Sequence, residues 1–402
     1  MPSAGPHLLR HFDDSLPPGK AMLWGAQKSL QRTDLPPEAI WDRLLSHMND
    51  CTTIPSPCPE LGLEVKVSEI DKALRQLWEQ DEARTNASLM NLVVFSEKPG
   101  ALLENSAIVR ELTRDHACRA ILTEVDRSIS EPTIRAWITA HCHLAQGKKT
   151  VCCEQVAFHL TGVVTGRFRN TVFAHLNSDL PLTLWWQGEI SDLLSERLAV
   201  VINRLVVDSS CWENPAKSFD RIESVSHVNH ELTLHDLEWS RSWQFRLGIA
   251  SLFDDAIARD ALPEIERIII HYHRDHRNCA LQLLAWLATQ AGWQDHPIMS
   301  SFSFQSAKGC DIEVVLEPNR DRPALQSIQL SMGKVMATVQ QLPNGAHIER
   351  RIEAGKHQAS SLTPADPVSP QDLVGQQLSR GGSNSLFRKV LPRFRKLLEH
   401  MG

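Results

Sequence analysis

The segment that most limits the possible folds is a short apolar run near the middle of the chain, Leu182 to Trp186, which ends in two adjacent tryptophans. Pro181 precedes the run, and Gly188 follows it and allows the chain to turn. An apolar run of this length between two turn residues predicts a buried strand, whose alternate side chains face opposite layers of the protein. The run therefore predicts a layered fold built around a sheet.

Strand and helix patterns alternate between residues 61 and 211, which predicts an α/β domain over 61–211. Ser68 can cap the first helix, and Lys148 and Lys149 lie in a turn that predicts a hairpin. The predicted strands are 89–95, 120–125, 134–144, 151–160, 182–186 and 205–207, and the predicted helices are 68–80, 101–114 and 162–175.

Residues 212–352 predict a second, α+β domain with a mostly antiparallel sheet. Trp243, Leu247, Ala250 and Ile257 form one stripe of a predicted helix, and Pro343-Asn344-Gly345 indicates a hairpin turn. The remaining predictions are a helix at 279–291 and strands at 263–272, 303–316, 325–331, 335–342 and 347–352.

The two ends of the chain differ from the domains between them. Residues 1–60 form a proline-rich N-terminal arm with nine prolines and one predicted helix, 37–48. Residues 353–402 predict a loop to about Asp372, followed by a basic amphipathic helix at 386–398. Pro392 is expected at the start of that helix or at a kink.

Composition excludes several classes of protein. The formal net charge of -6 argues against a dedicated nucleic-acid-binding protein. The sequence shows neither the pattern of a signal peptide nor an apolar run long enough to span a bilayer, so a cytoplasmic protein is expected. Nine cysteines without regular spacing do not describe a disulfide framework, and we expect most of them to be reduced and buried.

One motif suggests metal chemistry: His271-Tyr-His273-Arg-Asp275-His276 matches the ligand pattern of metallo-β-lactamase-like hydrolases. Two metals held there would activate a water molecule. Against this reading, the motif lies late in the chain, the glycine expected soon after it is absent, and His296 and His347 lie in no matching ligand motif. The alternative is a polar turn between a strand and a helix.

Two further clusters carry weaker signals. His141-Cys142-His143 and Cys152-Cys153 lie on predicted neighbouring strands, where adjacent side chains point to opposite faces. They are expected to be a histidine pair on the sheet surface and buried thiols rather than a zinc site. No phosphate-binding loop and no nucleophile elbow is found in the sequence.

The basic segment at the C-terminus has two readings. Phe387 to Leu398 could bind a membrane or an acidic partner, or it could dock on its own domain with the basic side chains in water. The second reading is the expectation here.

Several segments, in one order, match a single family. They are residues 84–94, 116–121, 180–188, Asp208-Ser209, 236–243, 250–254, 283–288 and Gly292-Trp293. Prominent among them are Leu180-Pro-Leu-Thr-Leu-Trp-Trp-Gln-Gly188 and Asp236-Leu-Glu-Trp-Ser-Arg-Ser-Trp243. Together they make the chain resemble the OpcA family, the glucose-6-phosphate dehydrogenase assembly proteins. The resemblance spans about residues 70 to 330, and the proline-rich first sixty residues are matched poorly.

The resemblance implies a non-catalytic partner that binds glucose-6-phosphate dehydrogenase and promotes its assembly and activation. The mechanism we expect is allosteric, and no cofactor or metal is expected. Tryptophan and arginine carry much of the energy of protein interfaces, so they are the candidate partner-binding residues. They are Trp185, Trp186, Trp239, Arg241 and Trp243, with Arg388, Lys389 and Arg393 of the basic tail. The alternatives are a metal-dependent hydrolase that uses the His271 motif, and a scaffold for another client.

Overall fold

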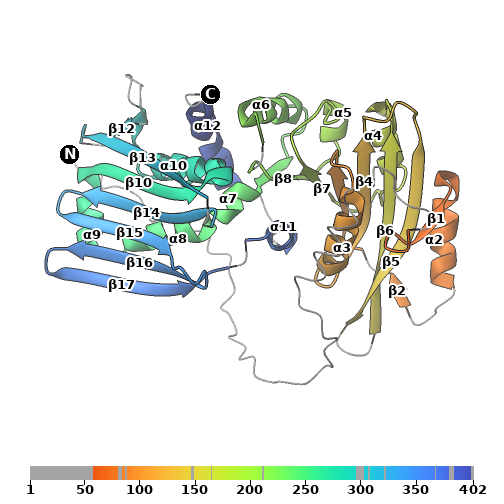
Figure 1. Cartoon of the computed structure of the whole chain (residues 1–402), viewed down its shortest axis with the longest axis horizontal. Helices are drawn as coiled ribbons and strands as arrows, with labels where there is room; N and C mark the ends of the chain where they lie inside the picture. The colour runs from red at the N-terminus through yellow and green to blue at the C-terminus, as the bar shows by residue number, and fades with distance from the viewer. Residues whose placement is uncertain are drawn as a thin grey trace. The chain divides into compact units, whose positions relative to one another are not determined.

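In the computed structural model of the chain, residues 56–402 form one compact unit. The structure describes residues 58–79, 84–86, 88–145, 149–163, 165–210, 212–295, 303–306, 308–320, 323–366, 368–379 and 384–399. The helix predicted at 37–48 lies outside these residues. Two sheets, each covered by helices, organise the described residues (Figure 1).

The first sheet has nine strands in the order β1-β5-β6-β4-β3-β7-β8-β9, with β2 paired to β6. Neighbouring strands from β6 to β9 are parallel, whereas β5 and β1 are added antiparallel. The strands are β1 Leu63–Val65, β2 Arg84–Asn86, β3 Met90–Ser96, β4 Cys118–Asp126, β5 Ile134–Ala145, β6 Lys149–Thr161, β7 Leu182–Gln187, β8 Arg204–Val207 and β9 Thr233–Asp236. The sheet is therefore mixed, because the β5–β6 hairpin reverses the chain, and that predicted hairpin is confirmed.

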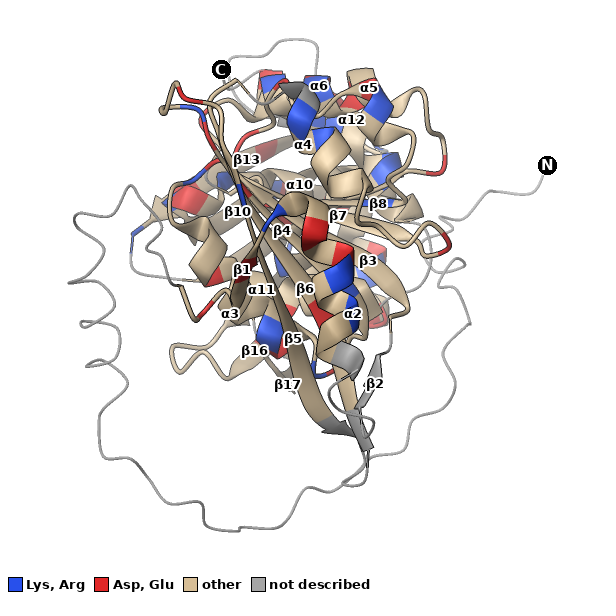
Figure 2. Ribbon diagram, turned by 90° about the vertical axis from the view of Figure 1, so that its right-hand side faces the viewer, with Lys and Arg blue, Asp and Glu red and all other residues tan. Residues whose placement is uncertain are grey.

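Helices cover both faces of the first sheet. α2 (Ile70–Glu79) contacts β5, and α3 (Ala101–Leu112) lies on the opposite face against β3, β4 and β6 (Figure 1). Because helices cover both faces of the sheet, β3 and β4 are buried along nearly their whole length and have continuous apolar sequences. Charged residues lie along α2 and at α5 (Glu196–Ala199) and α6 (Pro215–Ser226) (Figure 2). A short helix, α4 (Thr165–Phe173), follows β6, where a longer one was predicted.

The second sheet has eight strands in the order β11-β12-β13-β10-β14-β15-β16-β17. Only β10 and β13 pair parallel, so the expected mostly antiparallel sheet is confirmed. The strands are β10 Ile265–His273, β11 Gln294–Asp295, β12 Ser303–Gln305, β13 Asp311–Asn319, β14 Leu325–Met332, β15 Val335–Gln341, β16 His347–Ala354 and β17 His357–Pro364.

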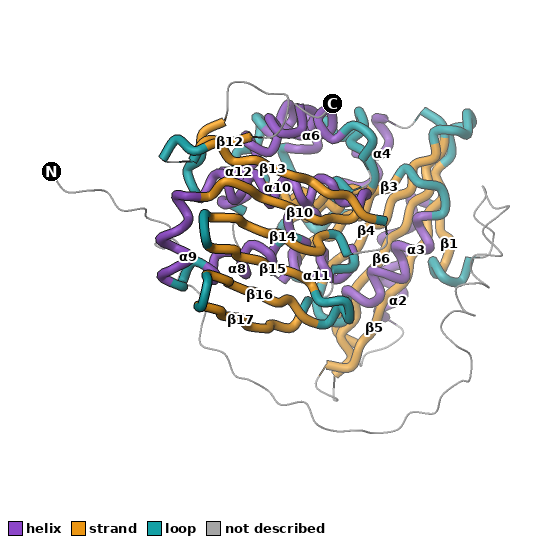
Figure 3. The backbone as a smooth tube through the Cα atoms, turned by 60° about the vertical axis from the view of Figure 1, so that its left-hand side comes forward, coloured by secondary structure: helices purple, strands orange, loops and turns teal. Residues whose placement is uncertain are grey.

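The helices of this half pack against one face of the second sheet. α8 (Trp243–Leu252) contacts β15 and β16, α9 (Ala256–Ala261) contacts β15, and α10 (Arg277–Gln290) contacts β10 (Figure 3). The strands accordingly alternate between buried and more exposed residues, as in β14 and β15. A five-residue helix, α7 (Leu237–Arg241), leads directly from β9 of the first sheet toward these helices.

The structure differs from the sequence-based expectation at 353–372, where a loop was predicted. Instead, β16 continues to Ala354, Gly355 and Lys356 form a tight turn, and β17 follows. β17 was missed because it is the last strand of its sheet and every one of its residues is exposed or half-exposed, so it carries no apolar alternation.

Two helices end the described chain, α11 (Pro370–Ser379) and α12 (Ser385–Glu399). α12 confirms the predicted amphipathic helix, with Pro392 inside it rather than at its start. No helix among the described residues is long and apolar enough to cross a membrane.

Candidate functional site

A group of buried polar side chains lies where β8 and β9 end. Asp236 closes β9 and caps α7, and its Oδ1 accepts hydrogen bonds from the backbone N–H groups of Ser209 and Glu238, both at 3.1 Å. Its Oδ2 accepts from Ser209 Oγ and from Gln282 Nε2, both at 2.6 Å. Because Gln282 belongs to α10, this one carboxylate ties the first sheet to the helix that covers the second.

Glu238 makes the second connection. Its Oε1 accepts from Arg241 Nη1 at 2.8 Å and lies 2.8 Å from His276 Nδ1. Its Oε2 accepts from the backbone N–H of Cys279 at 3.0 Å, in the first turn of α10, where the helix dipole favours a negative charge. Arg241 also holds Asp208 in a two-pronged contact of 2.8 and 2.7 Å.

Electrostatics set the protonation of this network. Burial acts to raise the pKa of Asp208, but the hydrogen bonds and charge of Arg241 hold it below its usual range. Burial raises the pKa of Asp236 to about 7, helped by the charge of Glu238 and opposed by the Ser209 hydrogen bond. Burial alone would lower the pKa of Arg241, yet its two carboxylate partners raise it, so the guanidinium stays charged. Asp236, Glu238 and Arg241 are buried, and the side chain of Asp208 is 20% exposed.

An aromatic and cationic stack leads from this network to the surface. The guanidinium of Arg246 lies 3.4 Å from the ring centre of Trp239 and 5.9 Å from that of Trp243. Trp239 is buried and also meets Phe387 of α12, with ring centres 5.1 Å apart. Trp243 is 37% exposed and lies one helical turn before Leu247, which is 45% exposed. Trp243 is the surface end of the stack.

The candidate partner-binding tryptophan and arginine residues therefore differ in their exposure to solvent. Trp185 and Trp186 lie next to each other on β7, where successive side chains point to opposite layers, and both are buried. The indole N–H of Trp186 donates to the carbonyl of Glu189 at 3.0 Å. Since Trp239 and Arg241 are also buried, Trp243 is the member of this group that a partner can reach in the described fold.

The tail residues belong to a helix that is docked on its own chain. Phe387, Val390, Phe394, Leu397 and Leu398 are buried on the inner side of α12. Arg388 donates to the carbonyls of His230 and Leu232, and Arg393 donates to the carbonyl of Trp293 at 2.7 Å. Lys389 is exposed. A cavity of about 140 Å³, lined mainly by apolar atoms of α6, β9 and α12, lies beneath the helix.

The His271 motif does not converge on one point. His271 lies 2.8 Å from Glu317, and His273 Nε2 lies 2.9 Å from the carbonyl of Arg320. His276 faces Glu238 instead. Asp275 is exposed; its backbone N–H donates to His273 Nδ1 at 3.2 Å, and its carboxylate lies 3.8 Å from the same nitrogen. In the described part of the chain, no three His, Cys, Asp or Glu side chains are arranged to hold a metal ion. The motif spans the last residues of β10 and the short helical turn, Arg274–His276, that leads into α10.

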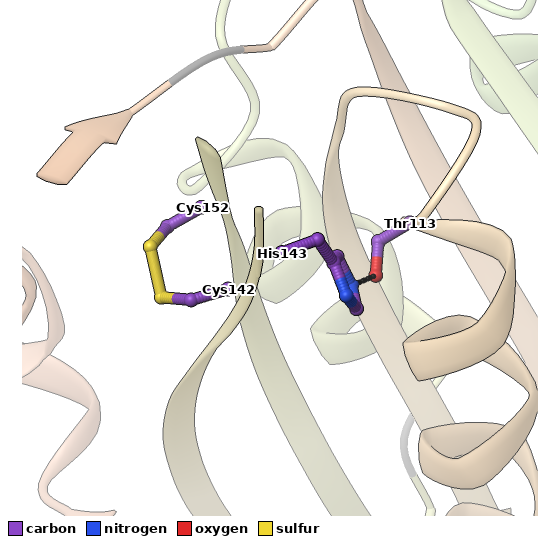
Figure 4. Close-up of a disulfide and its surroundings, with 4 residues drawn as sticks. All are labelled: Thr113, Cys142, His143 and Cys152. Atoms are coloured by element: carbon purple, nitrogen blue, oxygen red, sulfur yellow. Dashed lines mark hydrogen bonds between the residues drawn. A yellow bond between two sulfur atoms is a disulfide. The ribbon is translucent and has the colours of Figure 1, made fainter. Parts of the chain in front are cut away.

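The paired strands β5 and β6 correct the expectation for the cysteines. Cys142 and Cys152 stand directly opposite each other and form a disulfide, on the face away from His143, which meets Thr113 Oγ1 at 3.1 Å (Figure 4). The register of the two strands sets this pairing, with His141 opposite Cys153 and His143 opposite Val151. Among the described cysteines, Cys58, Cys118, Cys153 and Cys279 are buried and reduced, and Cys310 is reduced and exposed.

Comparison with known proteins places the chain in one family. Residues 109–224 match the family model described as "Glucose-6-phosphate dehydrogenase subunit N-terminal domain". Residues 232–391 match that of the corresponding C-terminal domain. Both halves are matched in the order in which they follow along the chain.

Three curated relatives carry the name OxPP cycle protein OpcA. That of Synechocystis sp. is 25% identical over 79% of this chain and 71% of its own length. That of Nostoc punctiforme is 27% identical over 71% of this chain and 66% of its own length. That of Synechococcus elongatus is 28% identical over 56% of this chain and 48% of its own length.

Similarity to solved structures is weak. A 3-ketoreductase from Actinomadura kijaniata in complex with TDP-benzene and NADP has a TM-score of 0.45 at 9% identity, over 77% of this chain and 96% of that one. An aldose–aldose oxidoreductase from Caulobacter crescentus has a TM-score of 0.40 at 10% identity, over 78% of this chain and 98% of that one. The two adjoining family matches and the relatives that carry one name are consistent with each other, and this chain belongs to the OpcA family of glucose-6-phosphate dehydrogenase subunits.

Proposed function

We propose that this protein is a non-catalytic effector subunit that binds glucose-6-phosphate dehydrogenase in the cytoplasm and raises its activity in the oxidative pentose phosphate pathway. The observation that carries the proposal is the match of both subunit domains, one after the other, over residues 109–224 and 232–391. The names of the curated relatives, which refer to the OxPP cycle, agree with it.

The chemistry of the buried network supports a structural role rather than a catalytic one. Asp208, Asp236, Glu238 and Arg241 are the residues that could supply acid, base or charge stabilisation. Their bonds are made to one another and to the ends of helices α7 and α10. Such a network holds the first sheet and the helices of the second in one fixed arrangement, which is what a rigid effector needs in order to present a constant surface.

Activation requires a difference in affinity between two states of the dehydrogenase. An effector that binds both states equally well shifts no population, however tightly it binds. The effector must therefore contact a surface of the dehydrogenase that differs between its less active and more active conformation or oligomer. Trp243 and Leu247, one turn apart on α8, are the contact residues we assign to this role, because an exposed tryptophan on a rigid helix is a typical interface anchor.

The test is a titration of the protein into glucose-6-phosphate dehydrogenase from the same organism. Initial rates are followed at several glucose-6-phosphate concentrations, and the size of the complex is measured by light scattering. A saturable rise in rate together with a larger complex supports the proposal. Absence of both, with a dehydrogenase that is active alone, refutes it, and binding without a change in rate favours a scaffold for another function.

The assigned surface has its own variant and control. Trp243→Ala should weaken the complex by roughly 30-fold, the effect of removing an interface anchor worth about 2 kcal/mol. Val200→Ala truncates another exposed apolar side chain, after α5, and should bind as the wild type does. Equal affinity of both variants and the wild type would place the contact elsewhere and leave the proposed function standing.

A further inference from the structure

One edge of the second sheet is formed by β17, the last strand in the sheet order. β17 pairs with β16 over all eight of its residues without a shift in register, from Ala354 opposite His357 to His347 opposite Pro364. No described strand pairs with its other side (Figure 3). A regular strand of this length thus presents an open row of backbone groups.

The geometry of the hairpin identifies those groups. The two-residue turn at 355–356 makes Ala354 and His357 a hydrogen-bonded pair, so the odd-numbered residues of β17 bond to β16. The bond from the N–H of Ala365 to the carbonyl of Ala346, at 2.9 Å, continues the same phase. The N–H and C=O groups of Gln358, Ser360 and Leu362 therefore point away from the sheet.

Among the outward-facing residues of β17, only Pro364, at the C-terminal end of the strand, forms a hydrogen bond with a described side chain. Gln244 of α8 donates from Nε2 to the carbonyl of Pro364 at 2.8 Å, and the ring of Pro364 leaves that residue no N–H. The three preceding outward-facing residues have no such contact with a described residue. The open stretch is therefore 358–362, with Ser360 at its centre.

This stretch lacks the features that protect edge strands from pairing. Natural sheets place charges, proline or bulges on their edges. Residues 358–362 read Gln-Ala-Ser-Ser-Leu, carry no charge and no proline, and include a leucine that is 58% exposed. The neighbouring β16, which is paired on both sides, contains two glutamates and two arginines. Residues 358–362 therefore contain no feature that would prevent pairing with another strand.

We propose that the partner on this edge is a second copy of the same chain, paired antiparallel through β17 about a two-fold axis at Ser360. In that register Ser360 faces its own equivalent, and Gln358 faces Leu362 of the copy. A two-fold axis brings identical side chains together, so a charge near it would repel itself, and 358–362 has none. A different protein would need a pocket or a charge beside the edge to be recognised, and the small hydroxyl groups at the centre supply neither.

The inference is tested by sedimentation velocity of the full chain from low to high micromolar concentration. Ser360→Pro removes one outward N–H and leaves the bonds to β16 intact, a position at which edge strands tolerate proline. Ser360→Lys places two like charges at the axis. Ser360→Ala keeps the N–H and is the matched control.

The expected result is a concentration-dependent dimer for the wild type and for Ser360→Ala. Ser360→Pro and Ser360→Lys should raise the dissociation constant of the dimer by roughly 10- to 100-fold, since two symmetry-related bonds are lost or two charges are opposed. Thermal unfolding of each variant checks that the fold is retained, and the lysine variant carries the test if the proline variant does not fold. A wild type that stays monomeric, or a dimer that both variants leave unchanged, overturns the proposal. A monomeric wild type whose binding to the dehydrogenase is abolished by Ser360→Pro would assign the edge to that enzyme instead.

Discussion

Replacement of Arg241 by methionine is the most direct test of the buried network. The Arg241 side chain is 5% exposed and bridges two carboxylates, those of Asp208 and Glu238, the latter fully buried. Methionine fills a similar volume but removes the positive charge. Both carboxylates would then remain in the interior without their cationic partner.

The expected loss of stability follows from that geometry. Removing one partner of a buried ion pair costs about 3 to 5 kcal/mol, because the remaining charge is left desolvated and unpaired. Glu238 keeps its bond from the N–H of Cys279, and Asp208 keeps one from the N–H of Ser210, which places the expectation for Arg241→Met near the lower end, at about 3 kcal/mol. Adding Glu238→Gln to this variant removes one unpaired charge and should recover part of the loss.

Urea denaturation at pH 7 measures the effect, followed by both tryptophan fluorescence and circular dichroism, because a chain of 402 residues need not unfold in one step. Arg259→Met is the control: its side chain is 45% exposed, pairs with Asp260 at 3.8 Å, and should change stability by less than about 0.5 kcal/mol. A loss below about 1 kcal/mol for Arg241→Met would refute the argument that the network carries buried charge.

The pH dependence gives an independent check. Arg241 holds the pKa of Asp208 below its usual range, so in the wild type this pair contributes stability above the unfolded pKa of an aspartate. That contribution is lost as the pH falls through the lowered pKa. The difference in stability between the wild type and Arg241→Met should therefore narrow in acid.

Three further predictions concern other parts of the fold. Burial raises the pKa of Asp236 to about 7. Its contribution to stability is therefore fully present below about pH 4, near the pKa of an unfolded aspartate, and is lost as the pH rises through 7. Asp236→Asn should remove this pH dependence of the free energy of unfolding between about pH 4 and 7. Replacing Cys142 and Cys152 by serine should lower the free energy of unfolding by about 3 kcal/mol, since the bond spans 10 residues of sequence, with thermal denaturation as the measurement. Gly62→Ala should cost about 2 kcal/mol or more in the same assay, because Gly62 has a φ of 96° and its added Cβ would lie 2.2 Å from the carbonyl oxygen of Ile138.

Each of these predictions has an outcome that contradicts it. A parallel pH profile for Asp236→Asn and the wild type would mean that this carboxylate does not titrate in the stated range. A reducing agent should destabilise the wild type and leave the double serine variant unchanged; an equal response of both would disprove a contribution of the disulfide. Gly100→Ala is the control for Gly62→Ala, since Gly100 also has a positive φ of 79° but open space where a Cβ would lie. An equal loss of unfolding free energy in both variants would mean that the clash with Ile138 does not contribute.

The parts of the candidate site that could be predicted from sequence are those with a strong local pattern. The segment from Asp236 to Trp243, which carries part of the family resemblance, includes Asp236, Glu238 and Arg241 of the buried network, and its role in partner binding stays a prediction. Whether each side chain faces the interior or the solvent was not predictable, because that depends on elements distant in the chain. Phe387, for example, lies 148 residues beyond Trp239 and covers it. Asp208, one of the two acceptors of Arg241, directly follows β8 and lies 33 residues before Arg241 in the chain.

By itself, the sequence determined the buried strands β3, β4 and β7, the β5–β6 hairpin, the amphipathic tail helix and the family. These signals are local, because a strand covered on both faces must be apolar throughout and a docked helix must be apolar on one side. Only the tertiary structure decided that β17 is a strand, that Arg241 is buried between two carboxylates, that Cys142 and Cys152 are bonded, and that Trp243 alone of the nominated tryptophans is exposed. The physical reason is the same in each case: the environment of these residues is set by contacts with distant segments, and a polar edge strand or a buried ion pair leaves no periodic pattern in the residues around it.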